Sequence, residues 1–94
     1  MHYTEHAQSR MQQRAVPPQV VEHVLDFGRV TRGPGRNGSR ADVYFMDRRG
    51  RAALGKAIGE DRYASLAGKL DVYVVVGDDG RVVTVARRTK RRRC

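Results

Sequence analysis

His6, Arg10 and Arg14 are spaced four residues apart near the start of the sequence, in and around the stretch EHAQSRMQQR. Residues at this spacing lie along one side of an α-helix. An imidazole can donate or accept a proton near neutral pH, and a guanidinium ion can hold a phosphate group. Three interpretations are therefore open: a solvated helix face, a surface that contacts nucleic acid, or part of an active site.

The other residues with potential for chemistry form no comparable group. His2 and His6 are also four residues apart, and His23 could be considered as a third metal ligand. No cysteine or acidic residue is spaced to complete such a site, so we expect no metal ion and no other cofactor. Ser39 and Ser65 have no neighbouring base that would make either a nucleophile. His6 is therefore the main candidate for proton transfer.

The positive charge is concentrated at the C-terminus. The formal net charge is +9, from 19 basic and 10 acidic residues. Six of the 19 basic residues lie close together at the end of the chain: Arg87, Arg88, Lys90, Arg91, Arg92 and Arg93. The remaining 13 basic residues give the rest of the chain a charge of only +3. Such a block is typical of segments that bind nucleic acid, and a solvated terminus is the alternative.

A length of 94 residues predicts one small domain. We expect this domain to span residues 1–88 and the basic tail, residues 89–94, to be disordered. No apolar run approaches the ~20 residues of a membrane span, and the polar start MHYTEHAQSR has no signal-peptide core. These features favour a cytoplasmic protein with no membrane contact. The single cysteine, Cys94, cannot form an internal disulfide.

Helical periodicity is clear in the first third of the chain and again in its middle. Thr4 is suited to cap a helix over residues 5–14. The stretch PPQVVEHVLDFG follows, with apolar residues at helical spacing, a proline start and Gly28 as its stop. Residues 48–69 are also mostly helical in pattern, and Gly59 is expected to divide them into two short helices.

Two strands are predicted on either side of a glycine-rich loop. Residues 29–32 and 41–46 have the composition of strands, and residues 33–39, GPGRNGS, connect them. The loop lacks the Gly-Lys-Ser/Thr ending of a phosphate-binding loop, and no helix follows it. We therefore expect no nucleotide site there.

The stretch LDVYVVVGDDGRVVTVARR predicts two strands joined by a turn at Asp79 and Gly80. The pairs that follow from this turn are Asp78–Arg81, Val76–Val83, Val74–Val85, Tyr73–Ala86, Val75–Thr84 and Asp71–Arg88. Cross-strand partners share a face of the sheet. Five valines therefore form one apolar face, the valine face, and Tyr73, Thr84 and Arg88 project from the other face. The residues of the valine face are Val72, Val74, Val76, Val83 and Val85.

Together these elements predict an α+β domain, with N-terminal helices packed on one face of a small, mostly antiparallel sheet that ends in a C-terminal β-hairpin. The helices should cover the valine face. The second face is then open to a ligand, and sheet faces of this kind commonly bind nucleic acid. The residues expected to contact nucleic acid are Arg14, Tyr73, Arg87, Arg88, Lys90, Arg91, Arg92 and Arg93.

Both ends of the chain resemble a known family. The opening Tyr3-Thr4-Glu5-His6-Ala7, continued by Arg10-Met11 and Arg14, and the ending Arg81-Val82-Val83-Thr84-Val85-Ala86-Arg87-Arg88 resemble the domain-of-unknown-function 4258 family. That family is similar to the RelE-like toxins and to the wider barnase/EndoU/colicin/RelE group of small ribonucleases. The middle of the chain, residues 33–69, matches only loosely.

The resemblance implies a RelE-like fold and cleavage of RNA without a metal, by attack of the 2′-hydroxyl on the adjacent phosphate. It implies that His6 is the general acid or base and that Arg10 holds the scissile phosphate. Thr84 matches a strand hydroxyl that would bind a phosphate oxygen. Many RelE-like enzymes use a C-terminal tyrosine, and no tyrosine follows Tyr73 in this chain.

Three functions are therefore open. The first is a metal-independent endoribonuclease or toxin-like module acting on RNA, with an acidic antitoxin-like protein as its partner. The second is a non-catalytic module that binds RNA or DNA. The third is an interaction domain without a nucleic-acid ligand, in which the charge serves solubility.

Overall fold

The computed structural model describes residues 2–34 and 40–87 and has an α+β architecture. Its elements in chain order are α1 (Glu5–Gln13), α2 (Pro18–Phe27), β1 (Arg29–Pro34), β2 (Arg40–Phe45), α3 (Arg48–Ile58), α4 (Glu60–Leu66), the 3₁₀ turn η2 (Ala67–Lys69), β3 (Val72–Gly77) and β4 (Val82–Arg87). The predicted helices and strands are confirmed within a few residues at their ends.

Capping residues set the starts of two helices. At α1, the Thr4 hydroxyl accepts a hydrogen bond from the Ala7 N–H at 3.1 Å, as the sequence predicts. At α3, the Asp47 carboxylate accepts one from the Gly50 N–H at 2.7 Å. The predicted break between α3 and α4 is confirmed at Gly59, whose φ of 92° is readily adopted only by glycine.

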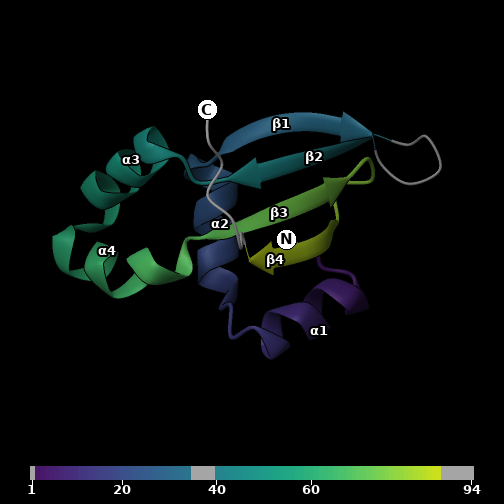
Figure 1. The fold of residues 1–94 in the computed structure, drawn as a ribbon, viewed down its shortest axis with the longest axis horizontal. Coiled ribbons are helices and arrows are strands. Elements are labelled where there is room, and N and C mark those ends of the chain that lie inside the picture. Colours follow the sequence, from purple (N-terminus) through teal and green to yellow (C-terminus); the bar gives the residue numbers. More distant parts are fainter. Residues whose placement is uncertain (1, 35–39, 88–94) are drawn as a thin grey trace.

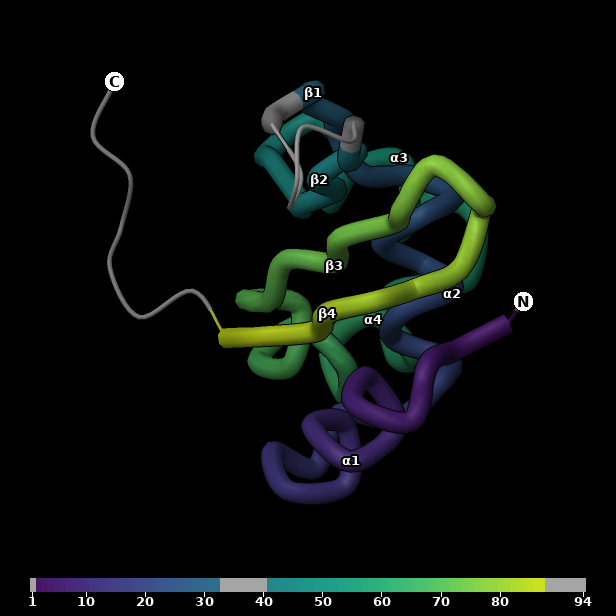
Figure 2. Tube along the Cα trace, turned by 90° about the vertical axis from the view of Figure 1, so that its right-hand side faces the viewer, coloured from purple at the N-terminus to yellow at the C-terminus, as the bar shows by residue number. Residues whose placement is uncertain are grey.

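The four strands form one antiparallel sheet in the order β1-β2-β3-β4. Figure 1 shows α2 behind this sheet, with α3 and α4 beyond its end. In the view turned by 90°, α2 lies on one side of the sheet and α1 lies beside β4 (Figure 2). None of the helices in the described ranges has the length and apolarity needed to cross a bilayer.

The core lies between the helices and one face of the sheet. Its buried residues are Ala7, Met11, Val16, Val20, Val21, Val24, Met46, Leu54, Leu70, Val72, Val74, Val82 and Val85. Burial of each larger aliphatic side chain contributes about 1.5–3 kcal/mol. The prediction that helices cover the valine face of the hairpin is therefore confirmed for Val72, Val74 and Val85.

The turn of the hairpin differs from the predicted one. The Gly77 N–H donates to the Arg81 carbonyl at 2.9 Å, so Gly77 and not Asp78 faces Arg81. The Gly80 N–H donates to the Gly77 carbonyl at 3.0 Å, and Gly80 has a φ of 83°. This is a three-residue loop that ends in a left-handed glycine.

A β-bulge restores the predicted register beyond the turn. Val76 faces Val82 rather than Val83, whereas Thr84 has its predicted partner. Val83 is thus an extra residue in β4, and the prediction that it belongs to the buried valine face is wrong, because Val82 takes that place. Since the bulge offsets the shift at the turn, Tyr73 and Thr84 still share a face.

The junction of α2 with the sheet leaves no room for a side chain at Gly28. A Cβ atom there would lie 2.8 Å from the Phe45 carbonyl oxygen and still closer to the Val24 carbonyl oxygen. Gly28 does end the helix, as predicted, but its φ of −75° is one that any residue adopts. Glycine is therefore needed here for close packing of α2 against β2.

Candidate nucleic-acid interface

The N-terminal segment pairs with the start of β4, the C-terminal strand. The Val82 N–H donates to the His2 carbonyl at 2.9 Å, and the Thr4 N–H donates to the Val82 carbonyl at 3.0 Å. Tyr3 and Val82 thereby form a parallel bridge. This pairing places the start of α1 next to the start of β4, so the two segments that carry the family resemblance are neighbours in space.

α1 runs alongside β4 in the same direction (Figures 1 and 2). Ala7 and Met11, on its inner side, are buried. Arg10 is partly buried, whereas His6 and the C-capping Arg14 are exposed. The helix that carries the predicted row of three basic side chains therefore borders β4.

The His6 side chain is exposed on α1. Within the described parts of the chain, it makes no hydrogen bond and no ion pair. A general acid or base normally needs a partner that orients its imidazole. The helix thus presents His6 to solvent, and a bound substrate would have to supply its hydrogen-bond partner.

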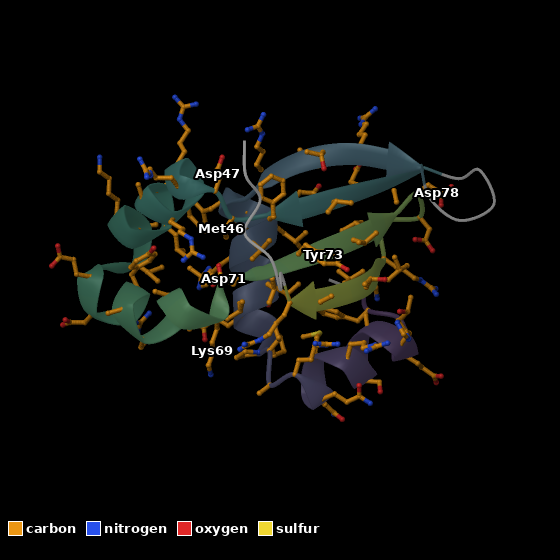
Figure 3. The ribbon with its side chains drawn as sticks, in the orientation of Figure 1. Met46, Asp47, Lys69, Asp71, Tyr73 and Asp78 are labelled. Atoms are coloured by element: carbon orange, nitrogen blue, oxygen red, sulfur yellow. The ribbon has the colours of Figure 1, made fainter. Side chains whose placement is uncertain are left out.

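The face of the sheet away from α2 is organised in two rows of cross-strand partners. The first row is Arg29, Phe45, Tyr73 and Ala86, and the second row is Thr31, Val43, Val75 and Thr84. We call these eight residues the open face, because no described helix covers them (Figure 2). Tyr73, labelled in Figure 3, lies on β3 between β2 and β4.

The open face combines half-buried aromatic and aliphatic side chains with positive charge. Phe45 and Tyr73 are half-buried, in contrast to the fully buried valines on the other face. Arg29 is exposed at one end of the first row, and neither row contains an acidic residue. Asp71, two residues before Tyr73, is paired with Arg51 at 2.7 Å. Two aromatic rings beside a cation are suited to bases and phosphates.

The predicted site residues from Tyr73 onward fall into three groups. Tyr73 and Thr84 share the open face, as predicted. Arg87 faces Val72 and so belongs to the opposite side of the sheet, at its exposed end. Arg88, Lys90, Arg91, Arg92 and Arg93, and with them the predicted pair Asp71–Arg88, lie outside the described residues.

Four residues of the open face have no face predicted from the sequence: Arg29, Thr31, Val43 and Phe45. Phe45 was placed in a strand, and Arg29 was placed in another, but neither was assigned to a face. The register of β2 against β3 brings Phe45 opposite Tyr73, and that of β1 against β2 brings Arg29 opposite Phe45. The alternation of residues along β1 and β2 would have divided each strand into two faces, but it gives no signal of which strand pairs with which.

A second polar cluster lies at the far end of the sheet, where α3 meets β3. Arg51 donates to Asp71 at 2.7 Å and to the Ala67 carbonyl at 3.2 Å. It lines a cavity of about 960 Å³ together with Asp47, which Figure 3 labels near Asp71. Because its charges are mixed and Arg51 is already satisfied, we interpret this cluster as a structural link between α3 and β3.

Two buried polar atoms have no hydrogen-bond partner within the described residues: the Tyr3 hydroxyl oxygen and His23 Nε2. Burial raises the pKa of Tyr3 above its usual 10.0, and the Glu22 carboxylate raises that pKa further. Tyr3 also lines a mostly apolar cavity between α1 and α2. Both atoms lie in the packing between helices and sheet, apart from the open face.

Comparison with known proteins adds no family. No family model, no curated protein and no solved structure matches this chain. Within the described ranges, no group of three or more His, Cys, Asp or Glu residues is arranged to hold a metal ion. The open face and the helix α1 beside β4 are therefore the features of the described chain that bear on its function.

Proposed function

We propose that this protein binds RNA through the open face of its sheet. The supporting observation is the pair of cross-strand rows, which hold two neighbouring aromatic rings, one exposed arginine and no acidic residue. Aromatic rings stack on bases and arginines neutralise phosphates, so the two requirements of RNA binding meet on one surface.

The charge around this face also supports RNA binding. Arg29 lies at the β1 edge of the sheet, and Arg10 and Arg14 lie on the helix beside the β4 edge. A phosphate backbone crossing the sheet would meet a cation at either edge. The net charge of +9 favours any polyanion over other ligands.

Salt dependence of binding tests this proposal. We expect a short single-stranded RNA to bind with an affinity that falls by roughly 0.7 log units per log unit of salt for each phosphate contacted. Arg29→Gln should weaken binding and reduce this slope by about one contact. Arg62→Gln, on the exposed side of α4, is the matched control and should change neither.

Binding that is absent, or that does not respond to salt, would contradict the proposal. Equal losses in the Arg29 and Arg62 variants would show only a general effect of charge and would also count against the open face. A parallel titration with DNA of the same sequence identifies the nucleic acid, and tighter binding to DNA would reject RNA as the ligand.

Cleavage of the bound RNA is a second candidate function, supported by the position of α1 along β4. RNA cleavage is also the activity that the resemblance to RelE-like toxins implies. His6 would take the proton from the 2′-hydroxyl as that oxygen attacks the adjacent phosphorus. Arg10 and the Thr84 hydroxyl would stabilise the negative oxygens of the phosphorane. The bond from phosphorus to the 5′-oxygen then breaks, the 5′-oxygen takes a proton from water, and a 2′,3′-cyclic phosphate remains.

An RNA digest in the presence of a chelator tests cleavage separately from binding. We expect wild-type protein to produce fragments ending in a cyclic phosphate and His6→Ala to produce none, while both bind RNA with similar affinity. If wild type and His6→Ala leave the RNA equally intact, with and without ribosomes, the protein is a binding module only. Harmless expression without an acidic partner protein would likewise argue against a toxin-like role.

A further inference from the structure

We infer that Phe45 and Tyr73 form a stacking platform for two unpaired bases, so that the ligand of the open face is single-stranded rather than duplex RNA. This inference rests on the proposed function and specifies its ligand. The geometry that carries it is the direct pairing of these two residues on the central strands β2 and β3.

The two rings are close enough to serve consecutive bases. Directly opposed residues on antiparallel strands have Cβ atoms about 4.5–5.5 Å apart. Both side chains project from the same face, and both are half-buried, so part of each ring remains accessible. The row continues with Ala86 on β4, directly opposite Tyr73.

Stacking on such a pair requires bases with accessible faces. In a duplex, each base is already stacked on both sides and paired at its edge, so its faces are hidden. In a single strand, bases can turn outward onto aromatic side chains while the backbone follows the cations. The Phe45–Tyr73 pair therefore selects for unpaired RNA, and it does so without reading the base edges.

Charge complementarity distinguishes RNA from a protein occupant of the same face. Arg29 extends the aromatic row, and neither row offers a carboxylate to a basic partner. A second copy of this chain would bring its own net charge of +9 against the first, which opposes face-to-face association. A phosphate backbone has the opposite charge and carries the bases that the rings can stack on.

The hydroxyl groups of Thr31 and Thr84 add contacts that do not depend on the base sequence of the RNA. Thr31 and Thr84 lie at the two ends of the second row, flanking Val43 and Val75. Their hydroxyls can donate to phosphate or ribose oxygens on either side of the stacked bases. We therefore expect preference for unpaired over paired RNA to be large and preference among bases to be small.

The test compares an unstructured RNA with a hairpin of the same length, using wild type and three variants. We expect wild type to bind the unstructured RNA roughly tenfold more tightly than the hairpin stem. Tyr73→Leu and Phe45→Leu should each remove most of this preference, with roughly tenfold weaker binding to the unstructured RNA. Tyr73→Phe keeps the ring and should retain the wild-type affinity.

Tyrosine emission supplies a readout that is specific to stacking. The chain contains no Trp and four Tyr, so its emission comes from tyrosine. Unstructured RNA should quench part of this emission in wild type, and the quenching should be lost in Tyr73→Phe although binding is kept. Val30→Leu, on the opposite side of the sheet, is the matched control and should behave as wild type.

The outcomes separate this inference from the proposed function. If no RNA binds, both fail. If Arg29→Gln weakens binding while Tyr73→Leu does not, or if hairpin and unstructured RNA bind equally well, RNA binding stands and the stacking platform is rejected. If wild type is a dimer in the absence of RNA and Tyr73→Leu makes it a monomer, a second copy occupies the open face. That result would also reject the stacking platform. Unchanged melting temperatures of the variants confirm that they are folded.

Discussion

The backbone of Thr4 is joined to that of Val82 by a hydrogen bond of 3.0 Å from the Thr4 N–H to the Val82 carbonyl. Thr4 also caps α1 through its side chain, with the Ala7 N–H as donor. One residue thus ties the N-terminal segment to β4 and fixes the point at which α1 begins. The position of α1, the helix that carries His6 and Arg10, beside β4 depends on this anchor.

Loss of the Thr4 hydroxyl should therefore weaken both the helix and its placement. Thr4→Ala removes the side-chain cap, and we expect it to lower the free energy of unfolding by about 1 kcal/mol. Thr4→Ser keeps the hydroxyl and is the matched control. Urea unfolding followed by circular dichroism measures the difference. Equal stability of the Ala and Ser variants would show that the cap contributes nothing.

The sequence was sufficient to predict features that depend only on neighbouring residues. The cap at Thr4, the proline start of α2 and the break at Gly59 are each set by the chemistry of one residue and its immediate neighbours. The valine alternation in β3 likewise reflects burial of one face of a strand. These features were predicted correctly for that reason.

Features that depend on strands far apart in the sequence could be predicted only in part. The partner of Phe45 is set by the pairing of β2 with β3, across the helical segment that connects them, and no local pattern specifies that pairing. The bulge at Val83 is set by the loop type, because a three-residue turn shifts the register and the bulge offsets the shift. The open face was therefore only half predicted, through Tyr73 and Thr84.

The bulge makes a direct prediction about two adjacent valines. Val82 is fully buried, whereas Val83 is only half-buried. We expect Val82→Ala to lower the free energy of unfolding by about 2–3 kcal/mol through lost burial and the cavity left behind. Val83→Ala should cost less than about 1 kcal/mol. The opposite order would support the regular hairpin that the sequence first indicated and would contradict the bulge.

Gly28 should tolerate no side chain, because α2 packs directly on the backbone of β2 there. A Cβ at this position would lie 2.8 Å from the Phe45 carbonyl oxygen, so Gly28→Ala must displace backbone. We expect a loss of about 1–3 kcal/mol in the free energy of unfolding. Gly68→Ala is the control, since a Cβ there has no atom within 4 Å. Thermal unfolding of the two variants should differ clearly, and equal melting temperatures would refute the close packing.

Tyr3 carries a buried hydroxyl without a partner in the described parts of the chain. Because such a group loses its hydration on folding and gains nothing in return, Tyr3→Phe should raise the free energy of unfolding by about 1 kcal/mol or leave it unchanged. If Tyr3→Phe instead lowers the free energy of unfolding by more than about 1 kcal/mol, the Tyr3 hydroxyl takes part in a hydrogen bond.

The same residue gives a dependence on pH whose sign follows from its raised pKa. Burial, with Glu22 nearby, holds Tyr3 protonated in the folded protein above the pH at which it ionises in the unfolded chain, near 10.0. Ionisation therefore favours the unfolded chain, and the free energy of unfolding is unaffected below about pH 10 and falls as the pH rises toward the folded-state pKa. The stability advantage of Tyr3→Phe over wild type should thus grow above pH 10, measured by urea unfolding at a series of pH values. An advantage that stays constant or shrinks in that range would mean that the Tyr3 hydroxyl ionises as easily in the folded protein as in the unfolded chain.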